Sequence, residues 1–256
     1  MTDPFTQSVR RSFGRQAANY NDHAQLQRAV AWRLARHCRD LEIPAGPCAD
    51  LGAGSGLLSL ALQVHRPDLK PSQIDLCPEL LARNPLASAQ PVSWDLNQGL
   101  PQDLPNPSLL LSSFALQWLE HPTHQLEHWC RQLRPGGWLV LAVPTAGSFP
   151  QWRLAAEAAA LPWSGLALPV ASELVAVAER ELQLRQRQRL RFQQPSTSPL
   201  AFLRSLCQIG AQASRSQPLG PAALRRLLAH WPAENRITWS VQLLIGQRPP
   251  SPDAVP

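Results

Sequence analysis

The residues from Asp50 to Gly56 have the types and the spacing of a ligand-binding turn. They read Asp-Leu-Gly-Ala-Gly-Ser-Gly, follow a short apolar run and precede a leucine-rich helical pattern over residues 57–62. Glycines have no Cβ, so the backbone can turn from a strand into a helix within a few residues and approach a ligand closely. The first amides of the helix then point into the gap. The segment therefore predicts a nucleotide-type site between a strand and a helix.

The spacing of the glycines indicates which kind of ligand this turn favours. Dinucleotide folds usually have Gly-x-Gly-x-x-Gly, with a pyrophosphate on the helix N-terminus. This chain has acid-x-Gly-x-Gly-x-Gly instead. The carboxylate of Asp50 at the strand end repels a pyrophosphate and favours a cation. S-adenosylmethionine carries a sulfonium and an ammonium and has no phosphate, so it suits this turn; a glycine-rich turn without any ligand is the alternative.

Two further acids follow later predicted strands. Asp75 and Asp95 each lie near the end of an apolar stretch. In an open parallel sheet the ligand lies across the carboxyl ends of the strands, so both acids and Asp50 are expected to face one crevice. Each acid alone suits a helix cap or a solvated loop. Together with the glycines, we expect Asp75 to accept the ribose hydroxyls and Asp95 to accept the adenine amino group.

The middle of the chain alternates between apolar strand patterns and helical patterns. Strands are predicted at residues 48–51, 74–76, 91–96, 109–114 and 138–143, and helices at 57–65, from 78 and at 125–133. Strands alternating with helices predict an α/β fold with a parallel, doubly wound sheet. Before this region, Asn21 or Asp22 is expected to cap a leader helix in which Leu26, Val30 and Leu34 recur four residues apart.

After Pro144 the regular alternation stops. Helices are predicted at residues 152–160, 173–180, 200–207 and 221–230, and strands at 182–192 and 237–245. The two late strands are expected to complete a mostly parallel seven-stranded sheet, with the helices around them forming a lid. Arg185, Arg187, Arg189 and Arg191 are expected on one face of the first of these strands. The predicted organisation is a leader and cap helix at 1–40, a ligand-binding α/β core at 41–146, a lid with the sixth strand at 147–235, the last strand at 236–246 and a disordered tail at 247–256.

Composition excludes several classes of protein. The chain has 256 residues, five cysteines and no apolar run near twenty residues, and its N-terminus is polar and basic. No metal-ligand spacing of cysteines and no signal peptide are visible, which predicts a cytoplasmic protein that does not engage a membrane. The net charge of +6 comes almost wholly from arginine, since Lys70 is the only lysine. Such a charge attracts an acidic partner, and nucleic acid and acyl carrier protein are both acidic.

The glycine turn and the acids resemble a class I S-adenosylmethionine-dependent methyltransferase, and the resemblance covers about residues 11 to 246. Several strings outside the shared core are similar to the malonyl-acyl-carrier-protein O-methyltransferases of biotin synthesis. The sharpest is Arg-Ser-Leu-x-x-Ile-Gly-Ala in the predicted lid, which begins at Arg204. The others are the segment from Ser12 to Tyr20 with Ala24 and Gln27, the string Leu116-Gln117-Trp118, and Gly147-Ser148-Phe149-Pro150.

The resemblance implies methylation of the free carboxyl of a malonyl thioester on acyl carrier protein or coenzyme A, by a monomeric enzyme without a metal. A malonyl carboxylate has a pKa of about 4 or lower by analogy with side-chain acids, so it is already ionised near neutrality and needs no base. The enzyme then has to remove water and align the carboxylate with the methyl-sulfur bond, which accounts for a lid.

The resemblance also assigns residues to the site. Tyr20 is expected to orient the methionine carboxylate or the acceptor, and Gln117 and Trp118 to line the pocket below the fourth strand. Arg204 and Arg15 are the candidates for binding the malonyl carboxylate, because a guanidinium binds carboxylates bidentately. The cofactor is expected to contact Asp50, Gly52, Ala53, Gly54, Gly56, Asp75, Leu76, Asp95, Leu96 and Ser112.

Other functions remain open at this point. The acceptor is alternatively another small carboxylate, such as aconitate, or a quinone precursor, although methylation on a ring carbon needs a base and none stands out. A non-catalytic, basic adapter that binds nucleic acid is a remote alternative, because no motif of interleaved basic and aromatic residues is visible. His121, His124 and His128 have helical spacing, but Leu126, Trp129 and Leu133 define the buried side of that helix.

Overall fold

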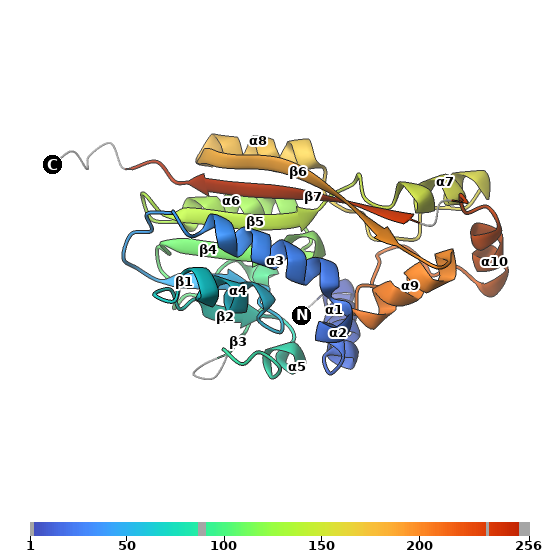
Figure 1. Ribbon diagram of the computed structural model, residues 1–256, viewed down its shortest axis with the longest axis horizontal. Coiled ribbons are helices and arrows are strands. Elements are labelled where there is room, and N and C mark those ends of the chain that lie inside the picture. Colours follow the sequence, from blue (N-terminus) through green and yellow to red (C-terminus); the bar gives the residue numbers. More distant parts are fainter. Residues whose placement is uncertain (1–2, 87–90, 234–235, 251–256) are drawn as a thin grey trace.

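The computed structural model describes residues 3–86, 91–233 and 236–250 and contains a seven-stranded sheet (Figure 1). The strand order is β3-β2-β1-β4-β5-β7-β6; β1 to β5 run parallel, and β7 is antiparallel to both of its neighbours. The prediction of a doubly wound, mostly parallel sheet closed by the two late strands is confirmed. The strands are β1 (Cys48–Leu51), β2 (Ser72–Asp75), β3 (Val92–Ser93), β4 (Leu109–Ser113), β5 (Trp138–Pro144), β6 (Gln183–Pro195) and β7 (Arg236–Gln247).

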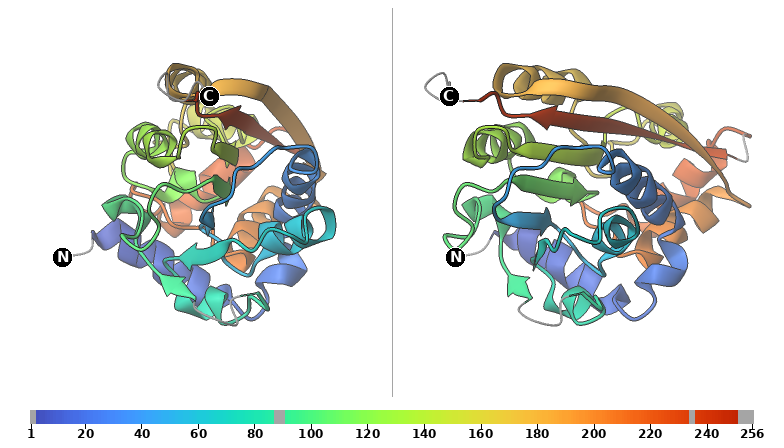
Figure 2. Two further views of the ribbon diagram at one scale, coloured as in Figure 1. Left: turned by 90° about the vertical axis from the view of Figure 1, so that its left-hand side faces the viewer. Right: turned by 60° about the vertical axis from the view of Figure 1, so that its left-hand side comes forward.

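Helices cover both faces of the sheet, as the two views of Figure 2 show. On one face α3 packs against α4, and on the other α6 packs against α8. The helices α7, α9 and α10 lie together beyond one end of the sheet (Figure 1). The helices are α1 (Pro4–Gln16), α2 (Tyr20–His23), α3 (Gln25–His37), α4 (Leu57–His65), α5 (Pro78–Leu81), α6 (Pro122–Gln132), α7 (Pro150–Ala158), α8 (Ala171–Glu181), α9 (Pro199–Gln208) and α10 (Pro221–Ala229), with 3₁₀ turns η1 (Leu96–Gln98) and η2 (Leu116–Trp118).

The central strands carry the core because both of their faces are covered. All of β5 and residues 109–112 of β4 are buried, with continuous apolar side chains rather than alternation over most of their length. Alternate residues point to opposite faces of a strand, so Leu109 and Leu111 belong to the α3 side while Leu110 belongs to the α6 side. The packing of helices on both faces of the sheet holds the carboxyl ends of the parallel strands at one edge.

The N-terminal region differs from the prediction in one respect. Asn21 and Asp22 lie inside the short helix α2, and the leader helix α3 begins only at Gln25, so neither residue caps it. An additional helix, α1, precedes them; Asp3 caps it by accepting from the amides of Phe5 and Thr6. Phe5 and Val9 are buried against the rest of the molecule, which explains why a polar, basic segment is ordered.

The C-terminal half differs from the predicted lid in its membership. The helix α8 packs on α6 and the strand β6 pairs with β7, so both belong to the layers around the sheet. The helices α7, α9 and α10 do not stack on α3, α4 or α6, although their buried side chains join the hydrophobic cluster on the α3 side of the sheet. The last strand continues to Gln247, and the backbone of Arg248 bonds with Gly136 and Gly137. The prediction of a disordered tail is therefore wrong for residues 247 and 248, which pair with the rest of the molecule, and residues 251–256 lie outside the described part.

The arginines of β6 do not share one face. The register with β7 shifts between Leu184 and Gln186, which is a β-bulge at Arg185. As a result, Arg185 donates to the carbonyl oxygen of Asp40 just after α3, whereas Arg187 pairs with Glu179 of α8 on the opposite side of the sheet. The prediction of a single-faced arginine ladder is wrong at its first member.

The described residues contain neither a membrane-spanning helix nor a metal-binding cluster. No helix in residues 3–86, 91–233 and 236–250 is long and apolar enough to cross a membrane. Over the same ranges, no group of three or more His, Cys, Asp or Glu side chains is arranged to hold a metal ion.

Candidate active site

The glycine turn between β1 and α4 uses its glycines for different purposes. Gly54 has a φ of +52°, and a Cβ placed there would meet only Leu80 at 3.8 Å and Asp75 at 3.9 Å. Gly56 has a φ of +86°, and its Cβ would lie 2.3 Å from the Asn84 side-chain oxygen. Both backbone conformations favour glycine. Gly54 therefore leaves space for a ligand, whereas Gly56 lets the turn pack against the segment that follows α5.

The carboxylate of Asp75 at the end of β2 is fixed by two backbone amides. The amide of Gly54 donates to Oδ2 at 2.8 Å, and the amide of Cys77 donates to Oδ1 at 2.7 Å. Burial nevertheless raises the pKa of Asp75 to about 6, and these hydrogen bonds oppose the rise. Each oxygen keeps a further lone pair, so the fixed carboxylate can accept two hydroxyl groups from a ligand.

A chain of buried polar side chains holds Asp50 at the end of β1. Ser59 of α4 donates to Oδ2 of Asp50 at 2.7 Å, Gln73 of β2 donates to Ser59 at 2.9 Å, and Asn84 donates to Gln73 at 2.7 Å. Burial raises the pKa of Asp50 to about 7, and the charge of Asp75 acts in the same direction while the Ser59 hydroxyl opposes it. Asp50 is thus a buried acid that has no cationic partner among the described residues, and such an acid can bind the positive charge of a ligand.

Asp50, Gly54 and Asp75 line a first cavity at the carboxyl ends of β1, β2 and β4. Asp95 lies beyond the short strand β3 and caps η1 by accepting from the amide of Asn97 at 3.0 Å. The hydroxyl of Ser113 is buried without a hydrogen-bond partner. The predicted residues that line this cavity are Tyr20, Asp50, Gly52, Ala53, Gly54, Asp75, Leu76, Asp95, Leu96 and Trp118.

A second cavity lies between the first one and the helices α7, α9 and α10. Leu203 and Leu206 of α9, Leu227 of α10 and Trp152 of α7 line it, together with Trp239 of β7. Its described lining includes no Asp, Glu, Lys, Arg or His. The second cavity therefore accepts an apolar or neutral polar group.

The two cavities share one wall. Five side chains line both of them: Phe13, Tyr20, Gln27, Phe114 and Trp118. Phe13 packs edge-on against Trp118 with ring centroids 5.4 Å apart, and lies 6.3 Å from Tyr20. We call these five residues the shared wall. A group that crosses the shared wall passes from the acid-lined cavity to the apolar one.

The loop after β4 shapes part of the shared wall. Phe114 has a φ of +57°, which is uncommon for a bulky residue and concentrates at functional sites. The side chain of Gln117 donates to the carbonyl oxygen of Phe114 at 2.7 Å and so holds this conformation. The side-chain oxygen of Gln117 is buried without a partner. Gln117 thus lines the second cavity and positions Phe114.

Burial also determines the state of the Tyr20 hydroxyl. Its pKa lies well above the ordinary value of 10.0, because burial and the charge of Asp75 both disfavour the phenolate. Tyr20 therefore remains protonated near neutral pH and acts as a hydrogen-bond donor rather than as a base.

Comparison with known proteins agrees with this geometry. A family model described as a methyltransferase domain matches residues 15–187. The chain belongs to this methyltransferase family. It is 31% identical over 236 residues to the biotin biosynthesis bifunctional protein BioCD of Bordetella avium, covering 86% of this chain and 48% of that protein. It is 26% identical over 253 residues to a malonyl-(acyl-carrier protein) O-methyltransferase of Neorickettsia risticii, covering 97% of this chain and 99% of that protein.

Coverage and structural likeness complete this comparison. The chain spans about half the length of some of the curated relatives that it matches. The crystal structure of the N-methyltransferase NodS from Bradyrhizobium japonicum, in complex with S-adenosylhomocysteine, superposes with a TM-score of 0.51 at 14% identity and covers 94% of this chain and 99% of that one. This likeness shows that the present chain has the class I methyltransferase fold.

Four residues predicted for the site lie outside both cavities of this methyltransferase-family chain. Ser112 is fully buried and donates to the carbonyl oxygen of Leu51 at 2.8 Å. Gly56 packs against Asn84, as described above. Arg15 on α1 and Arg204 on α9 are exposed, and Arg204 alternates with the inward-facing Leu203 and Leu206. The arginines expected to bind an acceptor carboxylate thus lie on the outer surface.

Sequence reasoning also missed three residues of the methyltransferase-family site. Ser113, rather than its neighbour Ser112, lines the first cavity, because adjacent strand residues point in opposite directions. Phe114 and Gln27 belong to the shared wall. Gln27 had a signal in the sequence, since it is part of the N-terminal string that resembles the family. No pattern indicated that its side chain reaches both cavities.

Proposed function

We propose that this chain transfers a methyl group from S-adenosylmethionine to the free carboxylate of a malonyl thioester carried on an acyl carrier protein. The observation that carries the proposal is the pair of adjoining cavities. The first is lined by three aspartates and by Arg10, and the second has no charged side chain in its described lining. The names of the curated relatives support malonyl-acyl carrier protein as the acceptor.

The first cavity fits the cofactor by the chemistry of its donor set. Asp75 offers two pinned carboxylate oxygens for the ribose hydroxyls, and Gly54 leaves open space beside them. Asp50 supplies a negative charge for the positive end of the ligand, and the unpaired hydroxyl of Ser113 offers a hydrogen bond. When bound, S-adenosylmethionine supplies an electrophilic methyl group on a positively charged sulfur.

The second cavity fits an acceptor that is already a nucleophile. Its described lining provides no carboxylate, histidine or lysine to act as a base, and Tyr20 is held in its protonated form. A carboxylate needs no deprotonation near neutral pH. The leucines and tryptophans of the lid exclude water, so the chain contributes desolvation and alignment, which together are worth about 7 kcal/mol or more in well-oriented reactions. Methylation of a ring carbon in a quinone precursor would need a base, and the described lining of the second cavity provides none.

The outer surface of the lid suits an acidic carrier. Arg204 of α9 and the pair Arg225 and Arg226 of α10 are exposed, on helices whose opposite faces line the second cavity. We place the docking of an acyl carrier protein on these helices, because basic side chains steer an acidic partner toward the site.

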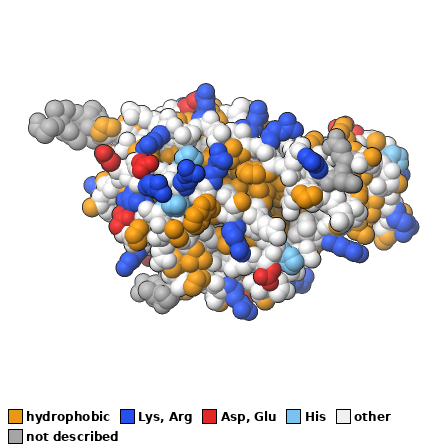
Figure 3. All heavy atoms as spheres, in the orientation of Figure 1, with side chains coloured by type: hydrophobic (Ala, Val, Ile, Leu, Met, Phe, Trp, Pro, Cys, Tyr) orange, Lys and Arg blue, Asp and Glu red, His pale blue; other side chains and the backbone are white. Residues whose placement is uncertain are grey.

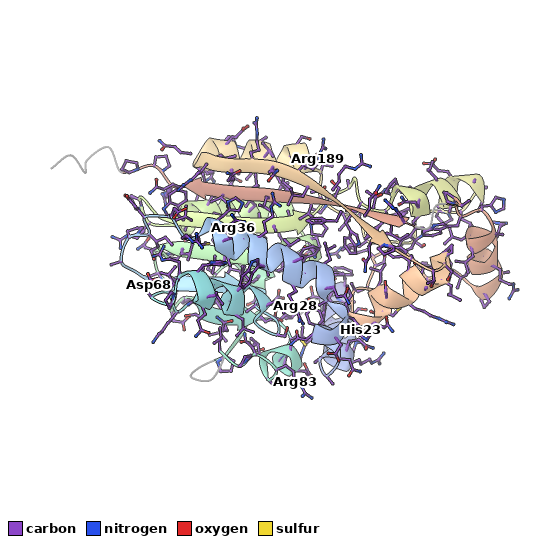
Figure 4. The ribbon with its side chains drawn as sticks, viewed as in Figure 1. His23, Arg28, Arg36, Asp68, Arg83 and Arg189 are labelled. Atoms are coloured by element: carbon purple, nitrogen blue, oxygen red, sulfur yellow. The ribbon has the colours of Figure 1, made fainter. Side chains whose placement is uncertain are left out.

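The arrangement of the arginines speaks against a nucleic-acid adapter. Arg28 and Arg36 on α3, Arg83 after α5 and Arg189 on β6 project from separate parts of the surface (Figure 4). On the face shown in Figure 3, the basic side chains are spread from one end to the other rather than gathered in one patch. A nucleic-acid site concentrates its positive charge along a stripe or face.

Methyl transfer with a labelled cofactor tests the proposal. Incubation with malonyl-carrier protein is expected to give a base-labile methyl ester, whereas succinyl-carrier protein and aconitate are expected to give little. Asp75→Asn is expected to abolish transfer, and Asp103→Asn, which changes an exposed acid, to leave it unchanged. Absence of any base-labile methyl ester with properly folded protein would contradict the proposed activity. Preferential transfer to aconitate would replace malonyl thioester as the acceptor.

A further inference from the structure

The shared wall contains hydrogen-bond donors that have no hydrogen-bond partner in the part of the chain that the structure describes. Tyr20, Gln27 and Trp118 carry polar groups and line both cavities. No hydrogen bond of these three side chains occurs among the described residues, and their polar atoms are not sealed from the cavities. All three are electrically neutral at the pH at which the acceptor is ionised.

We infer that Gln27 is an acceptor-positioning residue: its amide, together with the neutral donors of Tyr20 and Trp118, binds the acceptor carboxylate at the shared wall, and the sulfonium is the carboxylate's only cationic partner there. This inference rests on the proposed function and names the residues and the charge arrangement by which the carboxylate is recognised.

Gln27 differs from the other buried glutamines in its lack of partners. It lies in the first turn of α3 and is 7% exposed. Buried amides normally form hydrogen bonds, and a lost partner costs stability. The side-chain NH2 groups of the other buried glutamines each donate a hydrogen bond within the protein: Gln73, Gln117, Gln125, Gln151 and Gln242. The amide of Gln27 instead faces the cavities, where a ligand can satisfy it.

The chemistry favours neutral donors for this acceptor. A guanidinium would hold the carboxylate oxygens tightly and reduce their ability to attack carbon. Amide, phenol and indole N–H or O–H groups fix the direction of the oxygens without cancelling their charge. In the transfer, an oxygen–carbon bond forms as the sulfur–carbon bond breaks. The negative charge of the carboxylate and the positive charge of the sulfonium disappear together, and no proton moves.

This arrangement makes acceptor binding depend on the charge of the cofactor. The second cavity and the shared wall contain no Lys or Arg among their described lining residues, and Arg10 lines only the first cavity. A carboxylate that enters the second cavity therefore loses water and gains no cation from the lining of that cavity. A buried ion is stable only when it is paired. The acceptor is therefore expected to bind after the positively charged cofactor, and the uncharged ester to leave readily.

Substitutions of Gln27 test the positioning role. Gln27→Leu removes the donors at similar size, and a hydrogen bond to an ionised group is worth about a 10- to 100-fold change in affinity. We expect kcat/KM for malonyl-carrier protein to fall by about that factor, while the affinity for S-adenosylhomocysteine stays within about twofold. Gln27→Glu keeps the shape and adds a negative charge, so it is expected to eliminate acceptor binding.

Gln25→Leu is the matched control, because Gln25 is exposed on the same helix as Gln27 and lines neither cavity. Its kcat/KM is expected to stay within about twofold of the unmodified chain. Equal losses for Gln27→Leu and Gln25→Leu, or no loss for Gln27→Leu and Gln27→Glu with unchanged thermal unfolding, would overturn the role of Gln27.

Calorimetric titration tests the charge arrangement without turnover. Malonyl-pantetheine is titrated into the chain saturated either with S-adenosylhomocysteine or with a cofactor analogue that has an amine in place of the methylsulfonium. We expect at least tenfold tighter binding to the cationic complex, and no such difference for the methyl ester of the same thioester. Equal affinity for both complexes would refute the arrangement. If no malonyl thioester is methylated or bound at all, the proposed function fails first, which is a separate outcome.

Discussion

The buried charge of Asp50 is expected to lower the stability of the ligand-free chain and to strengthen the binding of a cationic ligand. Asp50→Asn is expected to raise the stability and to weaken the binding. The carboxyl is 1% exposed, accepts one side-chain hydrogen bond, from Ser59, and has no cationic partner among the described residues. Its pKa is raised from an ordinary value of 3.8 to about 7. That difference corresponds to about 4 kcal/mol of free energy of unfolding.

The direction in which the stability changes with pH depends on whether the folded or the unfolded chain holds the proton of Asp50 more tightly. Because the folded chain holds the proton of Asp50 more tightly than the unfolded chain, this contribution to stability is complete below pH 3.8. It declines as the pH rises and is lost once the pH exceeds about 7. Asparagine does not titrate. The stability advantage of Asp50→Asn over the unmodified chain is therefore expected to grow by about 4 kcal/mol between pH 4 and pH 8, or roughly 8 °C in thermal midpoint for a chain of this size.

The measurement is thermal unfolding of both proteins across this pH range without a ligand, followed by titration with S-adenosylmethionine at pH 7.5. Asp50→Asn is expected to bind the cofactor at least tenfold more weakly, because it lacks the negative charge. Asp103→Asn, at an exposed acid, controls for the loss of one charge and is expected to change neither quantity. A stability difference that stays constant with pH would refute the reasoning about burial.

Other substitutions separate the roles of neighbouring residues. Gly54→Ala is expected to weaken cofactor binding at least tenfold in calorimetry, since its methyl group enters the open cavity, with a stability loss of about 1 kcal/mol for a positive φ. Gly56→Ala is expected to lose about 2 kcal/mol or more in denaturant unfolding, because the new Cβ would lie 2.3 Å from Asn84. Tyr20→Phe is expected to lower kcat about tenfold while the cofactor affinity stays nearly unchanged, which single-turnover kinetics can check. Arg204→Ala is expected to raise KM several-fold for malonyl-carrier protein but not for malonyl-pantetheine, because the residue lies on the outside of the lid; an equal effect on both acceptors would argue against a docking role.

Local patterns in the sequence predict the sheet and its ligand-facing acids well. The apolar runs at 109–113 and 138–143 mark the central strands, and the acid-glycine turn marks the end of β1, because strand propensity and glycine conformation act over a few residues. The helix α1 was not predicted, because its buried apolar residues, Phe5 and Val9, are few and contact segments far along the chain. The bulge at Arg185 escaped it because strand register depends on the partner β7.

The division between sequence and tertiary structure is clearest at the shared wall. Local sequence was enough to predict the end of β1, the glycine turn and the acids Asp50 and Asp75, because each of these depends on a few neighbouring residues. The positions of Gln27, which lines both cavities, and of Arg204, which faces outward, could be read only from the tertiary structure. The direction of a helical side chain depends on how its helix packs against distant segments, and that packing is a sum of many weak contacts that no single motif encodes.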